Sequence, residues 1–342
     1  MPSNTAAWLA AEKATPLEVK SAPYTPPREN EIVIRARAVA INPVDCFIQI
    51  MGNALFSWLQ YPFILGSDVA GEVAEVGSGV TRFKVGDRVV GTGIGRVTNN
   101  PAEGAFQEYV VVLEHMASPI PDRVSYESAA VLPLGVSTAA CGLFQKDCLG
   151  LQLPTVPPKP TGKTLLIWGG STSVGSNAIQ LAVAAGYEVI TTASPRNFDY
   201  VKKLGASQVF DYHSETIVDE LVEAFKGKTC AGAFAIGQTA SVSCVEVVAR
   251  TEGTKFVALA NPLPEGHVVP DGIGTKFFFA SDIKDNEVSH AIYGDFLPKA
   301  LAAGTYICAP DPEVVGKGLE NIQPAFEILR NGVSAKKLVV SL

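Results

Sequence analysis

Two different hydrophobic patterns divide the chain. Over about the first 120 residues, short runs alternate apolar and polar positions at a period of two, which is typical of half-buried β-strands. These runs cover residues 31–37, 69–76, 88–91 and 109–112, and glycines lie between them. Only two stretches, 44–51 and 125–130, favour a helix here. This part of the chain is predicted to form a β-rich domain.

The second pattern begins at residue 163, where apolar runs alternate with amphipathic ones. Predicted strands cover residues 164–168, 187–193, 208–211, 231–236 and 255–259, and predicted helices cover 174–186, 198–204, 217–225 and 240–248. Strands that alternate with helices indicate a parallel sheet covered by helices on both faces. The preceding stretch 129–143 also reads as a helix of this domain. The fold class is therefore α/β, with a doubly wound parallel sheet beside a β-rich domain.

The linker and the tail complete the predicted domain organisation. Residues 150–162 contain four prolines in 13 positions and are predicted to be a loop. The tail carries an amphipathic helix around Ile322 and Phe326 and a final strand, 337–342. A lone terminal strand must pair with a sheet, and the β-rich domain is its natural partner. The expected domains are residues 1–124 with 300–342, and residues 125–299.

Composition narrows the class of protein. The chain of 342 residues is 47% hydrophobic and 18% charged, which is typical of a folded globular protein. A net charge of −7 without long basic runs argues against nucleic acid or an anionic membrane as a partner. No stretch has the length of a membrane span, so a cytoplasmic protein is expected. The six cysteines form no C-x-x-C pair and are expected to be small core residues; a monomer and a homodimer both remain open.

A glycine-containing turn follows the predicted strand 164–168. Aligned with the dinucleotide-binding fingerprint G-x-G-x-x-G, it has Gly170 and Gly175, but Thr172 stands at the middle glycine. Ser171, Thr172 and Ser173 still offer amide and hydroxyl donors at a helix N-terminus, where the helix dipole favours a pyrophosphate. The repeated strand and helix units around this turn favour dinucleotide binding over a merely capped helix. We therefore predict a Rossmann-type domain.

The next strand end bears on which dinucleotide is bound. An acid normally lies there in NAD-binding proteins and contacts the ribose 2′-hydroxyl. In this chain the segment 191–197 has no carboxylate before Asp199, and Ser194, Arg196 and Asn197 offer donors suited to a 2′-phosphate. An ordinary polar loop is the alternative. NADPH is predicted in preference to NADH.

Several strings in both domains now resemble one family. They are Gly66-Ser-Asp-Val-Ala-Gly-Glu-Val-Ala-Glu-Val-Gly77, Val85-Gly-Asp-Arg-Val89, Gly135-Val-Ser-Thr-Ala139 and Val209-Phe-Asp-Tyr212. Together they resemble the zinc-free medium-chain dehydrogenases/reductases, in the branch of quinone oxidoreductases and fungal trans-acting enoyl reductases. The resemblance implies a GroES-like β-rich domain followed by a Rossmann domain. Ala6-Ala-Trp8, Ala40-Ile-Asn-Pro-Val-Asp45 and Gly318-Leu-Glu-Asn-Ile-Gln323 point to the same branch.

The residues at the metal-binding positions of that family argue against zinc. Zinc-dependent relatives carry a ligand Cys where this chain has Asn42 and a ligand His where it has Ser67. No cysteine lies between Cys46 and Cys141, so a four-cysteine structural zinc site is not expected either. Without a Lewis acid, hydride transfer to a ketone is difficult, whereas an activated C=C needs only hydrogen-bond donors for the enolate oxygen. We expect no metal.

The resemblance also implies a role for particular positions. Ser171 to Val174 would hold the pyrophosphate, Ser194 to Asn197 with Tyr212 the 2′-phosphate, and Thr138, Leu259 and Ala260 the nicotinamide end; the β-rich domain would contribute Pro43 to Cys46, and the tail Val333 and Ser334. The full predicted cofactor set is Pro43, Val44, Asp45, Cys46, Thr138, Ser171, Thr172, Ser173, Val174, Ser194, Pro195, Arg196, Asn197, Tyr212, Leu259, Ala260, Val333 and Ser334. Substrate contacts are expected from residues 57–61, 131–138 and 277–282. The cluster Phe277 to Phe279 is equally compatible with the lining of an apolar pocket and with an edge strand.

No catalytic residue is assigned. Relatives often place a Tyr or Lys shortly after the N-P-x-D string, but Phe47 occupies that place here. Asp45 is expected to be mainly structural, bonding local amides, and Cys46 is expected to be a core residue rather than a reactive thiol. Protonation of the substrate by water is the preferred hypothesis.

Three functions remain open on the sequence alone. The first is an NADPH-dependent reductase of an enone, alkenal, enoyl group or quinone. The second is a trans-acting enoyl reductase of a fungal polyketide pathway, whose acyl chain is carried by another protein. The third is an NADPH-binding protein without enzymatic activity.

Overall fold

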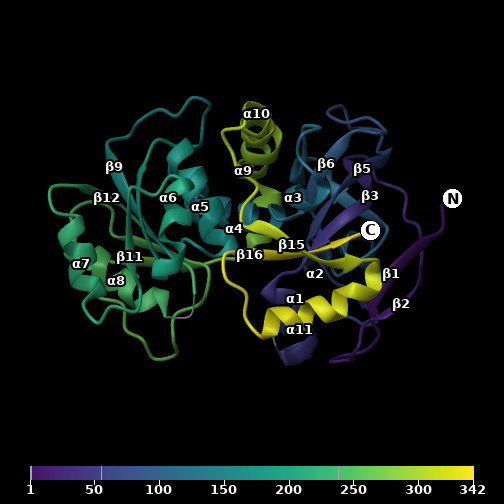
Figure 1. The fold of residues 1–342 in the computed structure, drawn as a ribbon, viewed down its shortest axis with the longest axis horizontal. Coiled ribbons are helices and arrows are strands. Elements are labelled where there is room, and N and C mark those ends of the chain that lie inside the picture. The colour runs from purple at the N-terminus through teal and green to yellow at the C-terminus, as the bar shows by residue number, and fades with distance from the viewer. Residues whose placement is uncertain (1, 55, 238) are drawn as a thin grey trace. The chain divides into compact units, whose positions relative to one another are not determined.

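The chain folds into two compact units. The computed structural model describes residues 2–54, 56–237 and 239–342. Unit 1 comprises Met1–Leu134 and Leu301–Leu342, and unit 2 comprises Gly135–Ala300 (Figure 1). The tail therefore belongs to the same unit as the N-terminal segment, and that unit is discontinuous. The chain leaves unit 1 after residue 134, ten residues later than the predicted boundary at 124, and re-enters it at residue 301 instead of 300.

The later boundary has a physical cause in helix α3 (Tyr126–Ala130), which packs against strands of unit 1. The Tyr126 hydroxyl donates a hydrogen bond of 3.2 Å to Glu72 in β5 (Asp68–Val76). Glu127 accepts one of 2.8 Å from Ser341. These bonds attach residues 125–130 to the β-rich unit and not to the nucleotide fold.

Two sheets form the frame of unit 1. The larger sheet has the strand order β15-β16-β3-β5-β6-β8, with β7 also paired to β3, and the smaller has the order β2-β1-β4. The strands not yet given bounds are β1 (Asn4–Leu9), β2 (Glu18–Ala22), β3 (Glu31–Ala40), β4 (Phe63–Ile64), β6 (Arg88–Thr92), β7 (Tyr109–Leu113), β8 (Ala117–Pro119), β15 (Asp311–Lys317) and β16 (Lys336–Ser341). The helices that concern the site are α1 (Pro43–Met51), α2 (Gly95–Thr98) and α11 (Ile322–Arg330).

The predicted strands and the tail are confirmed in unit 1. The four predicted runs correspond to β3, β5, β6 and β7. Terminal strand β16 pairs antiparallel with β3, where Val340 lies opposite Val39, and parallel with β15. Strands β1, β2, β4, β8 and β15 were not predicted.

Unit 2 is a doubly wound parallel sheet. Its strand order is β11-β10-β9-β12-β13-β14, and every pair is parallel. The strands are β9 (Lys163–Trp168), β10 (Glu188–Ala193), β11 (Gln208–Asp211), β12 (Thr229–Ala235), β13 (Phe256–Leu259) and β14 (Gly274–Phe277). The helices include α4 (Pro133–Phe144), which begins with the last two residues of unit 1, and α5 (Ser173–Ala184), α6 (Phe198–Lys203), α7 (Ile217–Ala224) and α8 (Ala240–Arg250).

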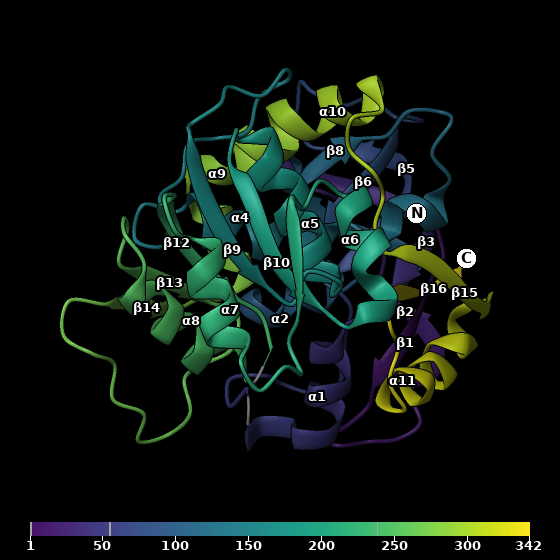
Figure 2. The same ribbon diagram turned by 60° about the vertical axis from the view of Figure 1, so that its left-hand side comes forward.

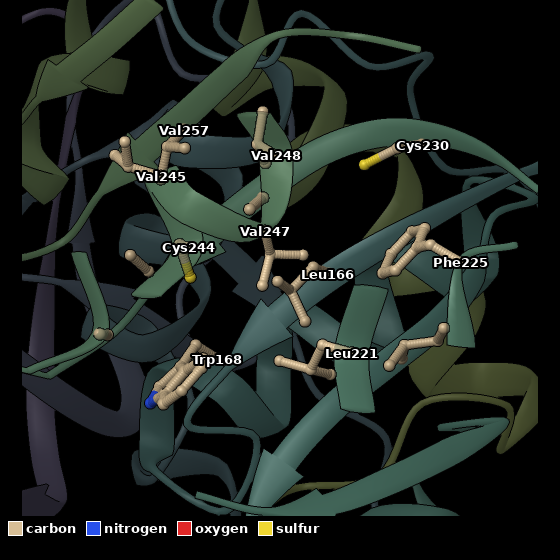
Figure 3. Packing of buried hydrophobic residues seen from close by; sticks show 14 of the residues in the cluster. Leu166, Trp168, Leu221, Phe225, Cys230, Cys244, Val245, Val247, Val248 and Val257 are labelled. Atoms are coloured by element: carbon tan, nitrogen blue, oxygen red, sulfur yellow. The ribbon is translucent and has the colours of Figure 1, made fainter. Parts of the chain in front are cut away.

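Side-chain alternation explains why this sheet is covered on both faces. Leu166 and Trp168 point to the face where α7 and α8 lie, and they join their apolar side chains in one cluster (Figure 3). Figure 2 shows α7 and α8 in front of this sheet. Leu165 and Ile167 point to the opposite face and are fully buried as well. A strand buried on both faces reads as a continuous apolar run, as the segment 164–168 does.

One predicted helix is interrupted, and one open alternative is partly decided. The predicted helix 129–143 is broken between α3 and α4, where Pro133 begins the second helix, because proline has no N–H for the helical ladder. The cluster Phe277 to Phe279 was open between an apolar pocket and an edge strand, and only Phe277 belongs to a strand, since it ends β14 at the edge of the sheet. Phe278 and Phe279 follow the strand; Phe278 is buried, and Phe277 and Phe279 are exposed. Residues 150–162 form a loop, as predicted.

One helical stretch in the described part of the chain, Tyr126–Phe144, is long and apolar enough to cross a membrane. Most of its apolar window, 78%, is buried inside the structure, as in the core helix of a globular protein.

Candidate functional site

The turn between β9 and α5 depends on two of the fingerprint glycines. A Cβ on Gly170 would collide with the Thr191 hydroxyl of β10, and a Cβ on Gly175 would collide with the Gly169 carbonyl. Both glycines therefore allow α5 to start close against the sheet, which is the role that the fingerprint assigns to them.

Thr172, at the position of the missing middle glycine, caps helix α5. Its Oγ1 accepts a hydrogen bond of 3.0 Å from the Gly175 amide and donates one of 2.8 Å to the Gly169 carbonyl. A threonine N-cap satisfies one of the free amides at the first helical turn. Thr172 departs from the fingerprint, but its side chain stabilises the same turn.

Ser173 supplies the observation that fits an anionic ligand here. Its Oγ is buried and has no hydrogen-bond partner among the described residues. A Cβ on Gly135, in α4, would lie 3.0 Å from that oxygen and 2.6 Å from the Asn177 amide nitrogen, so the two helix starts are close together. Buried hydroxyls are normally bonded, and an unbonded one at the N-terminus of a 12-residue helix fits a phosphate oxygen.

The end of strand β10 carries the polar group predicted for the 2′-phosphate. Ser194 Oγ lies 3.1 Å from the hydroxyl of Tyr212, which follows β11. Pro195 and Arg196 are exposed, whereas Asn197 is buried and turns away from solvent. The described residues of this turn include no carboxylate, as the sequence indicated. Ser194 and Tyr212 are therefore brought together at the carboxyl edge of the sheet, and the exposed Arg196 lies two residues after Ser194 in the chain.

His213 is a neighbour of this group that sequence reasoning missed. Its ring stacks on Tyr212 with 4.0 Å between ring centroids, and its Nδ1 lies 2.9 Å from Asp211 Oδ1. Hydrogen bonds from the His213 amide and ring lower the pKa of the Asp211 carboxyl. Its place directly after the Val209-Phe-Asp-Tyr212 string was the available signal.

The residues predicted for the nicotinamide end lie on other elements of unit 2. Thr138 is the half-buried position in the middle of α4, whose other nearby side chains are buried. Leu259 ends β13 and is buried, and the Ala260 amide donates to the Ala235 carbonyl at 3.0 Å, continuing the sheet. Their contact with a cofactor remains a prediction.

The remaining predicted cofactor residues lie in unit 1. In the first turn of α1, Pro43 is exposed, Val44 is half-buried, and Asp45 and Cys46 are buried. Val333 and Ser334 lie in the loop between α11 and β16 and are half-buried and exposed. Asp45 and Cys46 therefore present almost no surface to a ligand.

Asp45 has the structural contact that was expected of it. Its Oδ2 accepts a hydrogen bond of 2.9 Å from the Asn42 amide and so fixes the start of α1. Burial raises the pKa of the Asp45 carboxyl to about 7, although the Asn42 amide, Arg96 and Lys337 favour its ionised form. Burial also raises the pKa of the Cys46 thiol to about 12, so this cysteine is a protonated core residue.

A buried ion pair lies directly beside Asn42. Lys337 of β16 is 2.9 Å from Asp68 of β5, and the two side chains are 4% and 0% exposed. Asn42 joins them: its Nδ2 donates to Asp68 at 2.8 Å, and its Oδ1 accepts from Lys337. The other Asp68 oxygen accepts a hydrogen bond of 2.6 Å from the Leu134 amide, where the chain leaves unit 1.

The residue at the second metal-ligand position of zinc-dependent relatives is Ser67 in this chain, and it also contacts a cation. Ser67 Oγ accepts a hydrogen bond of 3.1 Å from the Arg96 guanidinium of α2. Asn42 and Ser67 thus bond to an ammonium and a guanidinium, whose charges oppose a metal ion at the same place. The described residues contain no group of three or more His, Cys, Asp or Glu side chains arranged to hold a metal.

Sequence reasoning missed Asp68, Lys337 and Arg96 as members of this site. Asp68 was visible inside the Gly66–Gly77 string, and Lys337 as a charge at the start of an apolar strand. Nothing in a linear pattern placed Arg96 beside Ser67.

Helix α1 also presents an apolar face to solvent. Phe47, Ile50 and Met51 are 49%, 47% and 45% exposed, and they recur at the spacing of one helix face. Phe47 occupies the place where relatives often carry a Tyr or Lys, and its side chain has no acidic proton.

Comparison with known proteins identifies the family. The sequence profile of the alcohol dehydrogenase GroES-like domain matches residues 28–122, and the profile described as zinc-binding dehydrogenase matches residues 173–273. The chain is 60% identical to dehydrogenase azaJ of Aspergillus niger, over 100% of both chains. It is 40% identical to trans-enoyl reductase himH of Aspergillus japonicus, over 99% of this chain and 97% of that protein.

A solved structure agrees over the same length. An alcohol dehydrogenase superfamily protein from Novosphingobium aromaticivorans superposes with a TM-score of 0.80 at 25% identity and covers 99% of each chain. From these matches and from the two units described above, the chain belongs to the medium-chain dehydrogenase/reductase family, whose members are nicotinamide-dependent oxidoreductases.

Proposed function

We propose that this chain reduces an activated C=C, as in an enone, an alkenal or an enoyl group, or a quinone, with NADPH and without a metal ion. The observation that carries the proposal is that Asn42 and Ser67, at the two metal-ligand positions of zinc-dependent relatives, are bonded to the cations Lys337 and Arg96. Cations at both positions do not suit a metal ion, and hydride transfer without a Lewis acid suits an activated C=C or a quinone better than a ketone.

The residues of unit 2 fit the predicted dinucleotide. The pyrophosphate would be held at the start of α5, where the buried Ser173 hydroxyl has no partner among the described residues. The 2′-phosphate would meet Ser194, Arg196 and Tyr212, and the missing carboxylate favours NADPH over NADH because an acid would repel that phosphate. When bound, the cofactor supplies a hydride from C4 of the nicotinamide ring.

The protein residues then have two tasks. They orient the acceptor toward the hydride, and they stabilise the negative charge that develops on its oxygen. Asp45 and Cys46 are buried, and Phe47 has no acidic proton. Water is therefore the proposed source of the proton. The exposure of Phe47 agrees with this, because solvent reaches that position.

A second candidate narrows the acceptor to an acyl chain carried by another protein. The resemblance to a protein named trans-enoyl reductase supports it, and so does the exposed apolar face of α1, Phe47, Ile50 and Met51. An apolar chain covers such a face better than a small quinone does.

Stopped-flow oxidation of NADPH with three classes of acceptor tests the proposal. The panel is a quinone, a set of 2-alkenals of increasing chain length and an enoyl thioester, each repeated with NADH. Enzyme treated with a metal chelator should be as active as untreated enzyme, and NADPH should bind more tightly than NADH. Rates that rise with chain length and with a thioester favour the second candidate. Loss of activity on chelation, restored by Zn²⁺, would contradict the proposal, as would a lack of turnover with every acceptor.

A further inference from the structure

We propose that Cys141 and Cys148 form a reversible internal disulfide when a hydroperoxide oxidises the protein, and that this disulfide loosens residues 277–282. Both cysteines and that segment belong to unit 2. The disulfide itself does not depend on the proposed function. Its effect on acceptor binding does rest on that function, because residues 277–282 are expected to contact the acceptor.

The two cysteines lie where the chain turns back on the end of helix α4. Cys141 belongs to the last turn of that helix. The Cys148 amide donates a hydrogen bond of 3.0 Å to the Gln145 carbonyl, and the Leu149 amide donates one of 3.2 Å to the Gly142 carbonyl. Because Leu149 and Gly142 are bonded, the residue before each of them, Cys148 and Cys141, is brought alongside the other.

The side chains of the two cysteines are in contact as well. Cys141 Sγ donates a hydrogen bond of 2.8 Å to Gln145 Oε1, and Cys148 Sγ lies 4.0 Å from the same oxygen. The two thiols also form a hydrogen bond with each other. Two thiols in contact can join in a disulfide with little movement of the backbone.

The two thiols differ in acidity, which gives each a role. The hydrogen bond with Cys141 holds the pKa of the Cys148 thiol below its usual value, and the Lys276 ammonium acts in the same direction, although burial opposes both. The hydrogen bond with Cys148 and burial raise the pKa of the Cys141 thiol. Because the thiolate is the nucleophile, Cys148 is the attacking cysteine and Cys141 the resolving one.

Another neighbouring pair, Cys230 and Cys244, lacks this asymmetry. Both side chains are fully buried, and burial raises the pKa of both thiols. A pair in which both thiols stay protonated does not supply the thiolate that attacks a peroxide.

A cleft beside Cys148 gives a small oxidant access to the pair. Cys148 is 6% exposed, whereas Cys141 is fully buried. The cleft has a volume of about 230 Å³. It is lined by Gln145, Lys146, Asp147, Asn286, Glu287 and Val288. It therefore reaches the Gln145 side chain, to which both thiols are bonded, and it is wide enough for a hydroperoxide.

The oxidation balances with the hydroperoxide as the only further reactant. The Cys148 thiolate attacks one peroxide oxygen, the O–O bond breaks, and the proton that Cys148 released ends on the leaving oxygen. Cys148 is then a sulfenic acid. The Cys141 sulfur attacks the Cys148 sulfur, the S–S bond forms, and the departing hydroxide takes the Cys141 proton and leaves as water. The two thiols lose two electrons and two protons, and the peroxide gains both.

Oxidation removes a bond that ties the segment after β14 to α4. Cys141 Sγ donates to the Phe279 carbonyl at 3.5 Å. A disulfide sulfur carries no proton, so neither this bond nor the one to Gln145 survives oxidation. Residues 277–282 should therefore become looser and bind an acceptor more weakly. The predicted pyrophosphate site at the start of α5 lies on another element and should be unaffected.

Peptide mapping tests the disulfide directly. Trypsin cuts after Lys146 and separates the two cysteines, so a disulfide joins the peptides 124–146 and 147–163. The folded protein is treated with hydrogen peroxide, its free thiols are blocked with N-ethylmaleimide in denaturant, and it is digested without reductant. The wild type should give the joined peptides, lighter by two hydrogen atoms than their sum, and dithiothreitol should separate them. A sulfinic acid on Cys148 without joined peptides would overturn the proposal, as would two unmodified cysteines.

Three variants test the role of each thiol. In Cys148→Ala, Cys141 should stay reduced, and in Cys141→Ala, Cys148 should stop at the sulfenic acid, which dimedone labels. Cys308→Ala is the matched control, since Cys308 is half-buried and so more accessible than either thiol, and it should form the disulfide as the wild type does. Dimedone on Cys141 in Cys148→Ala would contradict the assignment. Thermal unfolding checks that each variant is folded, and the wild-type peptides decide the disulfide even if one is not.

Steady-state kinetics with an enone tests the effect on acceptor binding. Oxidised wild type should show a KM for the enone that is raised about fivefold, the effect of one lost hydrogen bond, with an unchanged dissociation constant for NADPH. Dithiothreitol should restore the KM, and peroxide-treated Cys148→Ala should keep it. Joined peptides with an unchanged KM would overturn the link to residues 277–282. An enzyme that turns over no acceptor but still forms the joined peptides would overturn the proposed function and leave the disulfide standing.

Discussion

Asp45 shows how one buried carboxyl links stability to pH. Its pKa is raised from 3.8 to about 7 in the folded protein. Between these values the folded state keeps a proton that the unfolded state releases. This contribution to stability is therefore complete below about pH 4 and is lost as the pH rises toward 7.

Asp45→Asn should remove this pH dependence, because an amide does not titrate but still accepts the Asn42 hydrogen bond. Relative to the wild type, the variant should gain free energy of unfolding as the pH rises from 5 to 7, by up to about 1.4 kcal/mol per pH unit. Urea denaturation at both pH values measures the difference. Asp271→Asn, at an exposed aspartate, is the control and should show no such trend. A constant difference between Asp45→Asn and the wild type would show that Asp45 is already ionised in the folded protein.

Phe47 decides between water and a side chain as the proton source. It is 49% exposed at the place where relatives carry a Tyr. If water protonates the enolate, Phe47→Tyr should leave kcat for an enone within about twofold of the wild type, because the new hydroxyl adds a route that is not needed. Steady-state kinetics over pH 6 to 9 checks this. A rise of tenfold or more, with a new ionisation in the pH profile, would show that a solvent route limits the wild type.

At the scale of single elements, the start of α5 depends on the Thr172 side chain. Thr172→Ala removes the hydrogen bond to the Gly175 amide and should cost about 1 kcal/mol of stability, the usual loss for an N-cap. Because the pyrophosphate is expected at the same turn, NADPH should also bind more weakly. Thr172→Ser keeps the hydroxyl and should resemble the wild type in urea denaturation and in NADPH titration. Weaker NADPH binding in both variants would show that the threonine methyl group, and not the cap, matters.

Sequence patterns predicted best those elements whose buried positions follow a regular pattern along the chain. Strand β9 is buried on both sides and reads as an apolar run, and α5 follows it because the fingerprint glycines leave room for close packing. Strand β2 was missed since it is mostly exposed and has no alternation. The turn residues Thr172 and Ser194 were found because each lies shortly after a strand that the sequence predicts. Strand order needed the structure, whereas the break before Pro133 follows from the proline itself.

Contacts between distant parts of the chain explain why the unit 1 site was only half predicted. Asn42 and Ser67 were singled out as substitutions for metal ligands, but their partners Lys337 and Arg96 were not. The pairing of β16 with β3 brings Lys337 to Asn42, and a short helix after β6 brings Arg96 to Ser67. Such proximity follows from sheet register, which a single sequence does not reveal.

At the scale of the whole molecule, one ion pair joins the two segments of the discontinuous unit 1. Lys337 belongs to the tail and Asp68 to the N-terminal segment, and neither is accessible to solvent. Removal of one partner leaves a buried charge uncompensated, so Lys337→Met should lower the free energy of unfolding by about 3–5 kcal/mol. Asp68→Asn should also be strongly destabilising, since it leaves the ammonium unpaired.

The double variant Lys337→Met with Asp68→Asn should lose less stability than the sum of the single variants, because neither charge then remains alone. The neighbouring Lys336 offers a matched control: it lies 3.6 Å from Asp311 in an exposed pair, and Lys336→Met should cost less than about 1 kcal/mol. Urea denaturation of all four variants gives the coupling energy. Additive losses at positions 68 and 337 would mean that the two charges are not coupled, and that this ion pair does not join the two segments of unit 1.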